Sequence, residues 1–207
     1  LDAFHKDEDI HTATAASVYG VPMGDVTADM RRIAKIMNFG VLYGLSAYGI
    51  SRQTDLGAAE GAAFIETYFG KYPGIRSYVD STKASVAETG YVETLMGRRR
   101  YIPEISSTNR MVRASGERMA INMPIQGTAA DIMKIAMIQM DRRLAESGLP
   151  ARMILQVHDE LLFELPESHV PALAQLAREV MEGAYRLAVP LKVDIAAGPT
   201  WADLAPV

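Results

Sequence analysis

The sequence predicts an α+β fold in which a mostly helical N-terminal part precedes a part that mixes helices with antiparallel strands. Residues 1–90 carry helix-start and helix-stop signals with little strand pattern. Residues 91–102 place a glycine-containing turn between two short strand-like runs, and residues 151–165 place a polar bend between two apolar runs. We therefore expect two structural parts that divide near residue 108.

Capping residues define the helices of the first part. Asp9 and Thr27 offer side-chain oxygens that accept backbone hydrogen bonds at a helix start, and Gly20 and Gly90 can adopt the left-handed conformation at a helix end. Pro73 suits the first position of a helix. We expect helices at 9–19, 28–43, 58–69 and 73–89, with a short segment at 46–54.

The second part is expected to begin with a long helical region. This region should run over 108–123, break at Pro124 because proline lacks an N–H donor, and continue to Gly148. A further helix is expected over 171–187 and a last strand over 191–196.

Composition excludes several classes of protein and site. The chain has 207 residues, of which 49% are hydrophobic and 22% charged, which is typical of a globular protein. No apolar run reaches the roughly 20 residues that span a bilayer, so we expect no membrane partner. A cytoplasmic setting is compatible with this composition but is not demanded by it. The absence of cysteine excludes disulfides, thiolate metal sites and a cysteine nucleophile.

Charge is distributed unevenly along the chain, whose net charge is -4. Residues 31–54 contain basic residues and no acidic residue, and residues 92–118 contain six arginines against three glutamates. The acidic residues concentrate in 1–30 and 159–207. Two basic zones on an acidic chain suit a protein that contacts polyanions at chosen places, although solvated helix faces would give the same pattern.

A stripe of four side chains marks the helix expected at 28–43. Arg31, Lys35, Phe39 and Tyr43 recur every four residues, a spacing that places them on one helix face over about 18 Å. Two cations followed by two aromatic rings match a nucleoside triphosphate, with its phosphates beside the cations and its base beside a ring. The alternative is an amphipathic helix with buried rings and solvated cations.

The bend between the two apolar runs is the second candidate site. His158, Asp159 and Glu160 interrupt strands built of Leu, Val, Ile and Phe. Carboxylates on a rigid hairpin can bind Mg²⁺, which prefers oxygen donors and shares its sites with substrate phosphates. An ordinary polar turn is the alternative.

A pair of amides on either side of Pro124 is the third candidate. Asn122 and Gln126 are four residues apart, and such amides can reach the minor-groove acceptors present in every base pair. Helix-capping amides at a kink are the alternative. The sequence contains no phosphate-binding glycine loop, zinc-binding H-E-x-x-H helix or G-x-S-x-G nucleophile turn.

These stretches, in this order, resemble family A DNA polymerases, and the bacterial DNA polymerase I type above all. The resemblance rests on RRIAKIMNFGVLYG, which keeps the pattern R-x-x-x-K-x-x-x-F-G-x-x-Y-G, and on QVHDE. It extends to DIHTATAASVYG, YVETLMGRRRYIP, ERMAINMPIQGTAADIMK and GPTW, and so covers nearly the whole chain.

The resemblance implies template-directed transfer of deoxynucleotides from dNTPs to a primer 3′-hydroxyl. It makes Asp159, Glu160 and Lys35 the candidate catalytic residues, with Asp159 and Glu160 as ligands of two Mg²⁺ ions. The implied nucleotide-binding residues are Arg31, Lys35, Phe39, Tyr43 and His11. The implied contacts to primer-template DNA are Arg118, Asn122, Gln126 and His158.

The same resemblance implies a fingers subdomain over 1–108 and the C-terminal part of a palm subdomain over 109–207. The family's other metal-binding carboxylate lies in a D-[YF]-S-Q-I-E-L-R type strand, which this sequence lacks. We therefore expect the chain to need the N-terminal portion of the same polymerase for activity, in a bacterial, nucleoid-associated setting. Two alternatives stay open: a catalytically silent module that binds DNA or nucleotide, and an unrelated α+β domain with a structural role.

Overall fold

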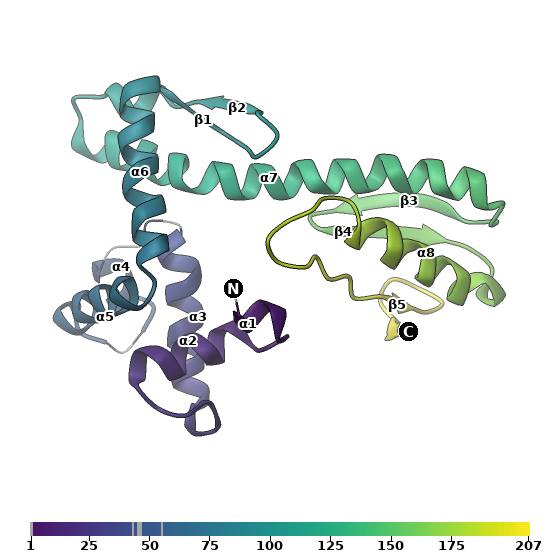
Figure 1. Ribbon diagram of the computed structural model, residues 1–207, viewed down its shortest axis with the longest axis horizontal. Coiled ribbons are helices and arrows are strands. Elements are labelled where there is room, and N and C mark those ends of the chain that lie inside the picture. Colours follow the sequence, from purple (N-terminus) through teal and green to yellow (C-terminus); the bar gives the residue numbers. More distant parts are fainter. Residues whose placement is uncertain (1, 43, 45–46, 55) are drawn as a thin grey trace. The chain divides into compact units, whose positions relative to one another are not determined.

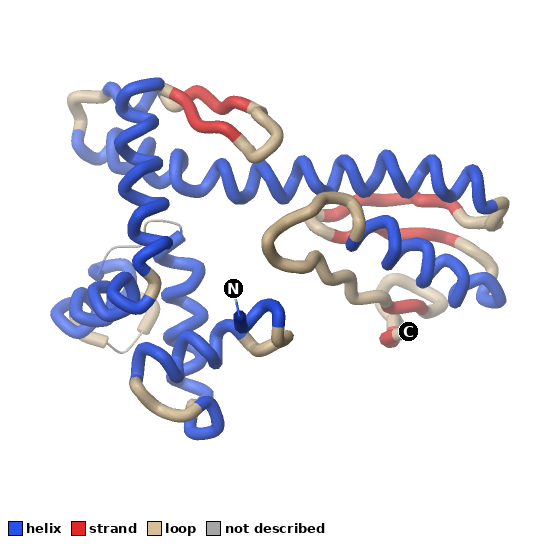
Figure 2. Tube along the Cα trace, viewed as in Figure 1, coloured by secondary structure: helices blue, strands red, loops and turns tan. Residues whose placement is uncertain are grey.

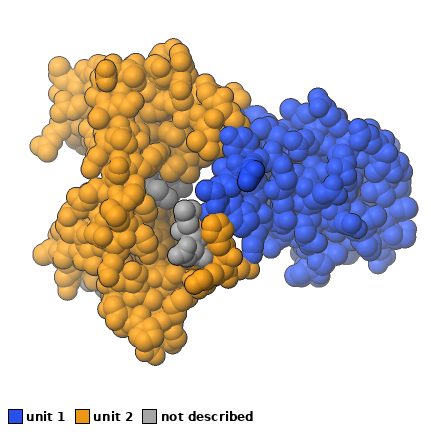
Figure 3. Space-filling model, in the orientation of Figure 1, with its two compact units in different colours: residues 1, 129–207 blue, residues 2–128 orange. Residues whose placement is uncertain are grey.

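The computed structural model describes residues 2–42, 44, 47–54 and 56–207. Helices dominate it, and its strands form small antiparallel pairs (Figures 1 and 2). This confirms the α+β class. The chain divides into two compact units, a first unit of residues 2–128 and a second unit of residues 129–207 (Figure 3).

The first unit consists of helices and one hairpin. Its elements are α1 (Asp2–His5), α2 (Ile10–Tyr19), the 3₁₀ turn η1 (Met23–Asp25), α3 (Ala28–Leu42), α4 (Ala47–Ser51), α5 (Ala58–Lys71), α6 (Pro73–Thr89), β1 (Tyr91–Glu93), β2 (Arg99–Tyr101), η2 (Pro103–Ser106) and the N-terminal half of α7 (Arg110–Ser147).

The expected caps form in this unit. Asp9 accepts hydrogen bonds from the backbone N–H groups of His11 and Thr12 at 2.9 and 3.0 Å, and Thr27 accepts one from Met30 at 3.2 Å. Such bonds satisfy donors that have no partner inside the helix. Gly20 closes α2 in the left-handed conformation, with a φ of 70°.

Two apolar clusters hold the first unit together. One packs α3 against α4 and α5, with Met37, Ile50, Phe64 and Tyr68 buried. The other packs the end of α6 and the hairpin against α7, around Val86, Val92 and Ile102. The first cluster fixes one face of α3, so the opposite face of that helix is left for other contacts.

The second unit packs two helices against a hairpin. Its elements are the C-terminal half of α7, β3 (Arg152–Val157), β4 (Glu160–Glu164), η3 (Glu167–His169), α8 (Val170–Glu182), β5 (Ala196–Ala197) and β6 (Ala205–Pro206). Strands β3 and β4 pair antiparallel from Arg152 opposite Glu164 to Val157 opposite Glu160. Leu173, Leu176 and Val180 of α8 share one core with α7 and both strands (Figure 1).

The expected helix break at Pro124 is wrong, because α7 runs without interruption through this residue. Proline removes only one N–H donor, and the hydroxyl of Thr128 donates to the Pro124 carbonyl at 2.5 Å. The hydroxyl of Tyr78 donates to the carbonyl of Ile121 at 2.7 Å. Side-chain hydroxyls from α6 and from within α7 thus donate hydrogen bonds to the carbonyls of Ile121 and Pro124, where the helix is uninterrupted.

Three expected element ends also differ. Helix α5 continues through Gly70 to Lys71 and stops before Pro73, because a proline disfavours the helical conformation of the residue that precedes it. Helix α8 stops at Glu182, before Gly183, a poor helix former. Residues 191–195 form no strand, and the Glu182 carboxylate accepts a hydrogen bond from the Val193 N–H at 3.2 Å.

No helix within the described residues is long and apolar enough to cross a membrane.

Candidate active site

Helix α3 presents the predicted stripe on the face opposite its core. Ala34 and Met37 have no exposed surface, whereas Lys35 is exposed and the Phe39 side chain is 45% exposed. The rings of His11 on α2 and Phe39 lie 5.5 Å apart, centroid to centroid. Tyr43 lies outside the described residues. The structure therefore joins His11 to the stripe, which spacing alone could not predict.

Arg31 is held by an ion pair with Asp9. Its Nε and Nη2 atoms both contact Oδ2 of Asp9, at 2.9 and 2.6 Å. The backbone N–H of Thr12 and then the Arg31 guanidinium are the main causes that lower the pKa of Asp9 to about 2. Asp9 is therefore charged throughout the neutral range, and the Arg31 side chain has a defined direction.

His11 is a neutral side chain in this setting. Partial burial is the main cause that lowers the pKa of His11; the negative charge of Asp9 opposes this shift, and the positive charges of Arg31 and Lys35 add to it. The side-chain nitrogen of Asn38 lies 3.1 Å from His11 Nδ1 and donates to the Thr14 hydroxyl at 3.0 Å. When that amide donates to Nδ1, the proton of the neutral ring lies on Nε2, which becomes a donor.

Asp9, Asn38 and Thr14 are site residues that the sequence analysis missed in this role. Asn38 follows Arg31 and Lys35 at helix positions i, i+4 and i+7, so it shares their face, and that spacing could have identified it. Asp9 was expected only as a helix cap. Its pairing with Arg31 links residues 22 positions apart, which no local pattern indicates.

Lys35 differs from Arg31 in having no ion-pair or hydrogen-bond partner within the described part of the chain. Its exposed ammonium, the Arg31 guanidinium and the His11 ring form the basic cluster, to which Asp9 contributes one negative charge. Such a set of cationic and neutral donors suits an anion that carries several oxygens.

The predicted DNA-contacting amides lie on α7 within the first unit. Gln126 is exposed, and Asn122 is half-buried with an Oδ1 atom that has no hydrogen-bond partner among the described residues. A buried amide oxygen without a partner is costly, so a donor from a ligand or from water would satisfy it. Both side chains remain candidates for DNA contact.

The β1–β2 hairpin docks close to these amides. The Leu95 N–H donates to the Thr128 hydroxyl at 3.0 Å. A Cβ atom at Gly127 would lie 2.7 Å from the Thr94 methyl carbon, so glycine permits this close approach.

Arg118 lies next to the C-terminal end of α3. A Cβ atom at Gly44 would lie 2.7 Å from Cγ of Arg118, and Gly44 has a φ of +69°, which other residues rarely adopt. The guanidinium-bearing side chain of Arg118 is exposed. The fold thus places a further basic residue beside the C-terminal end of α3, within the first unit.

The predicted carboxylates lie in the second unit, at the β3–β4 hairpin. His158 and Asp159 form its two-residue turn, Glu160 begins β4, and all three are exposed. His158 has a φ of +52°, and its carbonyl accepts a hydrogen bond from the Gln156 amide at 2.6 Å. A non-glycine residue in this conformation stores strain, which is frequent at functional turns.

The donors at this turn fit a hard divalent cation in chemistry but not in number. Two adjacent exposed carboxylates can provide oxygen ligands for Mg²⁺. Within the described residues, no three His, Asp or Glu side chains form a group able to hold a metal ion. The turn therefore offers fewer protein ligands than a complete metal site would need.

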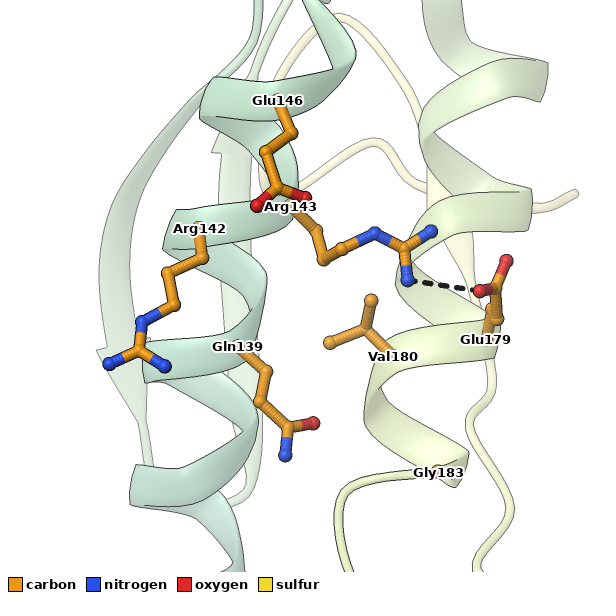
Figure 4. Close-up of a pocket in the computed structure, with 7 residues that line it drawn as sticks. All are labelled: Gln139, Arg142, Arg143, Glu146, Glu179, Val180 and Gly183. Carbon is orange, nitrogen blue, oxygen red and sulfur yellow. Dashed lines mark hydrogen bonds and ion pairs between the residues drawn. The ribbon is translucent and has the colours of Figure 1, made fainter.

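One hollow of about 330 Å³ lies between α7 and α8 in the second unit. Figure 4 shows Arg143 extending across it to Glu179, with an Nη1 to Oε1 distance of 3.0 Å. The two charges neutralise each other, and no predicted site residue lines the hollow. It is therefore not a candidate active site.

Comparisons of this chain with a family model and with known proteins point to the same family. Residues 1–203 match the model of DNA polymerase family A. The chain is 53% identical over 201 residues to DNA polymerase I of Pseudomonas aeruginosa, covering 97% of this chain and 22% of that protein. It is 50% identical over 203 residues to DNA polymerase I of Geobacillus stearothermophilus, covering 98% of this chain and 23% of that protein.

A solved structure is also similar. It is described as the POL domain of Pol1 from M. smegmatis in complex with DNA primer-template and dNTP. The TM-score is 0.88 at 46% sequence identity, over 92% of this chain and 34% of that one. The chain spans less than a quarter of the length of the two curated relatives, and it belongs to DNA polymerase family A.

Proposed function

We propose that this chain provides the nucleotide-binding part, and part of the catalytic centre, of a DNA-directed DNA polymerase. The reaction is transfer of a deoxynucleotide from a dNTP to a primer 3′-hydroxyl, directed by a template. Family membership and the similarity to two bacterial DNA polymerases I support this activity. The similar structure holds primer-template and dNTP, which are the partners we propose here.

The observation that carries the proposal is the basic cluster beside the exposed Phe39 ring. Arg31 and Lys35 would bind the triphosphate and balance its charge. His11, as an Nε2–H donor, would add a hydrogen bond to a phosphate oxygen. Phe39 would pack on the sugar and base, since its ring is 45% exposed next to the cluster.

The remaining residues would contact the primer-template and the nascent base pair. Arg118 would contact the backbone, and Asn122 and Gln126 would contact minor-groove acceptors. His158 would lie at the primer end, and Tyr43 at the templating position. With these roles we assign a fingers subdomain to residues 1–108 and part of a palm subdomain to residues 109–207. With the activity we assign a bacterial cytoplasmic, nucleoid-associated location.

Asp159 and Glu160 would hold two Mg²⁺ ions together with an upstream aspartate that this chain does not contain. When bound, such ions lower the pKa of the attacking hydroxyl and stabilise charge on the transferred phosphate. We assign Asp159 the leading role as ligand, as the family resemblance implies, and it lies exposed in the two-residue turn. Glu160 begins the strand, and we assign it a lesser role.

We further propose that the N-terminal portion of the same polymerase binds this chain. The β3–β4 hairpin exposes Ile154 at 52% and Leu155 at 44% of their surface, although strand residues of this kind are usually covered. The missing palm strands would cover these side chains and bring the second metal-binding carboxylate. A chain without that portion would bind nucleotide and lack polymerase activity.

The test is primer extension by the purified chain, with Mg²⁺ and four dNTPs, in the presence and absence of the N-terminal portion. We expect extension only in its presence. Robust extension by the chain alone would contradict the shared metal site. No extension under either condition, with dNTP binding intact, would favour the silent binding module.

A further inference from the structure

Asp9 uses its two carboxylate oxygens for two separate tasks. Oδ1 accepts hydrogen bonds from the N–H groups of His11 and Thr12, at 2.9 and 3.0 Å. Oδ2 accepts from Nε and Nη2 of Arg31, at 2.9 and 2.6 Å. One side chain therefore fixes the first turn of α2 and a cation of α3 at the same time.

Both residues that Asp9 holds belong to the basic cluster. His11 is at the second position of α2, so the helix cap positions the backbone that carries its ring. Arg31 carries five N–H donors in a planar fork, and Asp9 engages only the Nε–Nη2 edge. The Nη1 side has no partner within the described residues and can bind an oxyanion while the ion pair stays intact.

The end of α2 cannot itself serve as an anion site. A helix N-terminus attracts anions through its free N–H groups, but Asp9 already occupies those of His11 and Thr12. We therefore assign phosphate binding to the side-chain donors of the cluster. Their directions matter more for that reason, and Arg31 is the one whose direction the fold determines.

We propose that Asp9 is a positioning residue for the triphosphate, holding Arg31 in the orientation that binds a phosphate oxygen. This inference rests on the proposed function and adds to it a residue that touches no substrate. Exposed arginine side chains lose conformational freedom when they bind a ligand, and an arginine that is already fixed loses less. A carboxylate that merely competed with the phosphates for Arg31 would have the opposite effect on affinity.

The experiment measures the affinity of the purified 207-residue chain for two probes, Mg²⁺·dATP and inorganic tripolyphosphate, by calorimetry. Asp9→Asn is the main variant, because asparagine caps a helix as well as aspartate and lacks the charge. We expect it to weaken binding of both probes roughly 3- to 10-fold while the unfolding temperature changes little. Asp9→Ala removes the cap as well and should also lower the unfolding temperature.

The matched control is Asp29→Asn. Asp29 also forms an ion pair with an arginine of α3, with 3.2 Å between its Oδ1 and Nε of Arg32. Arg32 is not part of the basic cluster. Removing this charge should leave the affinity for tripolyphosphate unchanged or slightly higher. A second control is the Arg31→Ala background, in which Asp9→Asn should have no further effect on affinity.

The outcomes separate this inference from the proposed function. Unchanged or tighter binding by Asp9→Asn would overturn the positioning role, and so would an equal loss in the Arg31→Ala background. If Lys35→Ala binds tripolyphosphate as well as the unaltered chain does, the basic cluster is not the phosphate site. The proposed function then fails, and the role of Asp9 fails with it.

Discussion

The two proposed sites, one in each unit, differ in how much of each is built from this chain. In the first unit, Asp9, Arg31, Asn38 and His11 form a connected set of hydrogen bonds on a helix whose other face is buried. In the second unit, Asp159 lies exposed in a two-residue turn, with Glu160 as its carboxylate neighbour.

The difference suggests that nucleotide binding and catalysis can be separated in this protein. In the first unit, the proposed phosphate donors lie on one helix face, and the ion pair with Asp9 fixes the direction of Arg31. In the second unit, the proposed metal ligands lie in a two-residue turn, and we assign the remaining ligands to the N-terminal portion. Substitutions in the first site should therefore affect affinity, and substitutions in the second site should affect turnover.

The largest effect is expected for Asp159→Asn in the enzyme reconstituted with the N-terminal portion. Loss of a metal-binding carboxylate should lower kcat at least about a hundredfold, because charge on the transferred phosphate loses its stabilisation. The dNTP dissociation constant and the unfolding temperature should change little, since Asp159 is exposed and asparagine suits the same turn.

Glu164→Gln is the matched control, an exposed carboxylate at the other end of the same hairpin. It should leave kcat unchanged. A kcat loss of equal size in both variants would show that the hairpin's charge, and not a ligand position, matters.

Lys35→Ala should weaken nucleotide use by at least about tenfold, because a charge-assisted contact contributes about 1.5–3 kcal/mol. The measurement is kcat/KM for single-nucleotide incorporation. Arg32→Ala provides the control, since Arg32 is an exposed cation on the same helix but points to Asp29. Near-normal incorporation by Lys35→Ala would remove this residue from the phosphate site.

A smaller effect is expected for Phe39→Tyr. The added phenolic hydroxyl can make the hydrogen bond that a missing sugar hydroxyl leaves unmade, whereas phenylalanine cannot. We expect the ratio of dideoxy to deoxy incorporation to rise about threefold or more, as one hydrogen bond would give. Equal ratios in the two enzymes would contradict the placement of the sugar beside Phe39.

The smallest effect concerns pH and stability. Asp9 and His11 both have pKa values below those of the unfolded chain, so the unfolded state takes up protons first as the pH falls. Stability from Asp9 should be lost between pH 3.8 and about 2, and His11 should lower stability below pH 6.5. The unfolding temperature should depend less on pH than in the unaltered chain, in the acidic window for Asp9→Asn and near pH 6.5 for His11→Gln. Curves parallel to that of the unaltered chain would contradict both assignments.

Features of the proposed sites that lie within a single helix or hairpin could be predicted from the sequence. The four-residue spacing of α3 identified its exposed face, and two apolar runs around a polar bend identified the Asp159 turn. The Asp9–Arg31 ion pair and the ring contact of His11 with Phe39 join different helices, so they depend on packing that spacing does not encode. The hydrogen bonds of the Tyr78 and Thr128 hydroxyls beside Pro124 likewise involve packing and local geometry that spacing does not encode.

The most direct test of the separation is dATP binding by the 207-residue chain alone, compared with the same chain plus its N-terminal portion. We predict measurable binding by the chain alone that weakens in Lys35→Ala and not in Arg32→Ala. Adding the N-terminal portion should then bring primer extension without restoring any missing phosphate contact. If dATP binds only after that portion is added, the proposed phosphate site is not complete in this chain, and the account is contradicted.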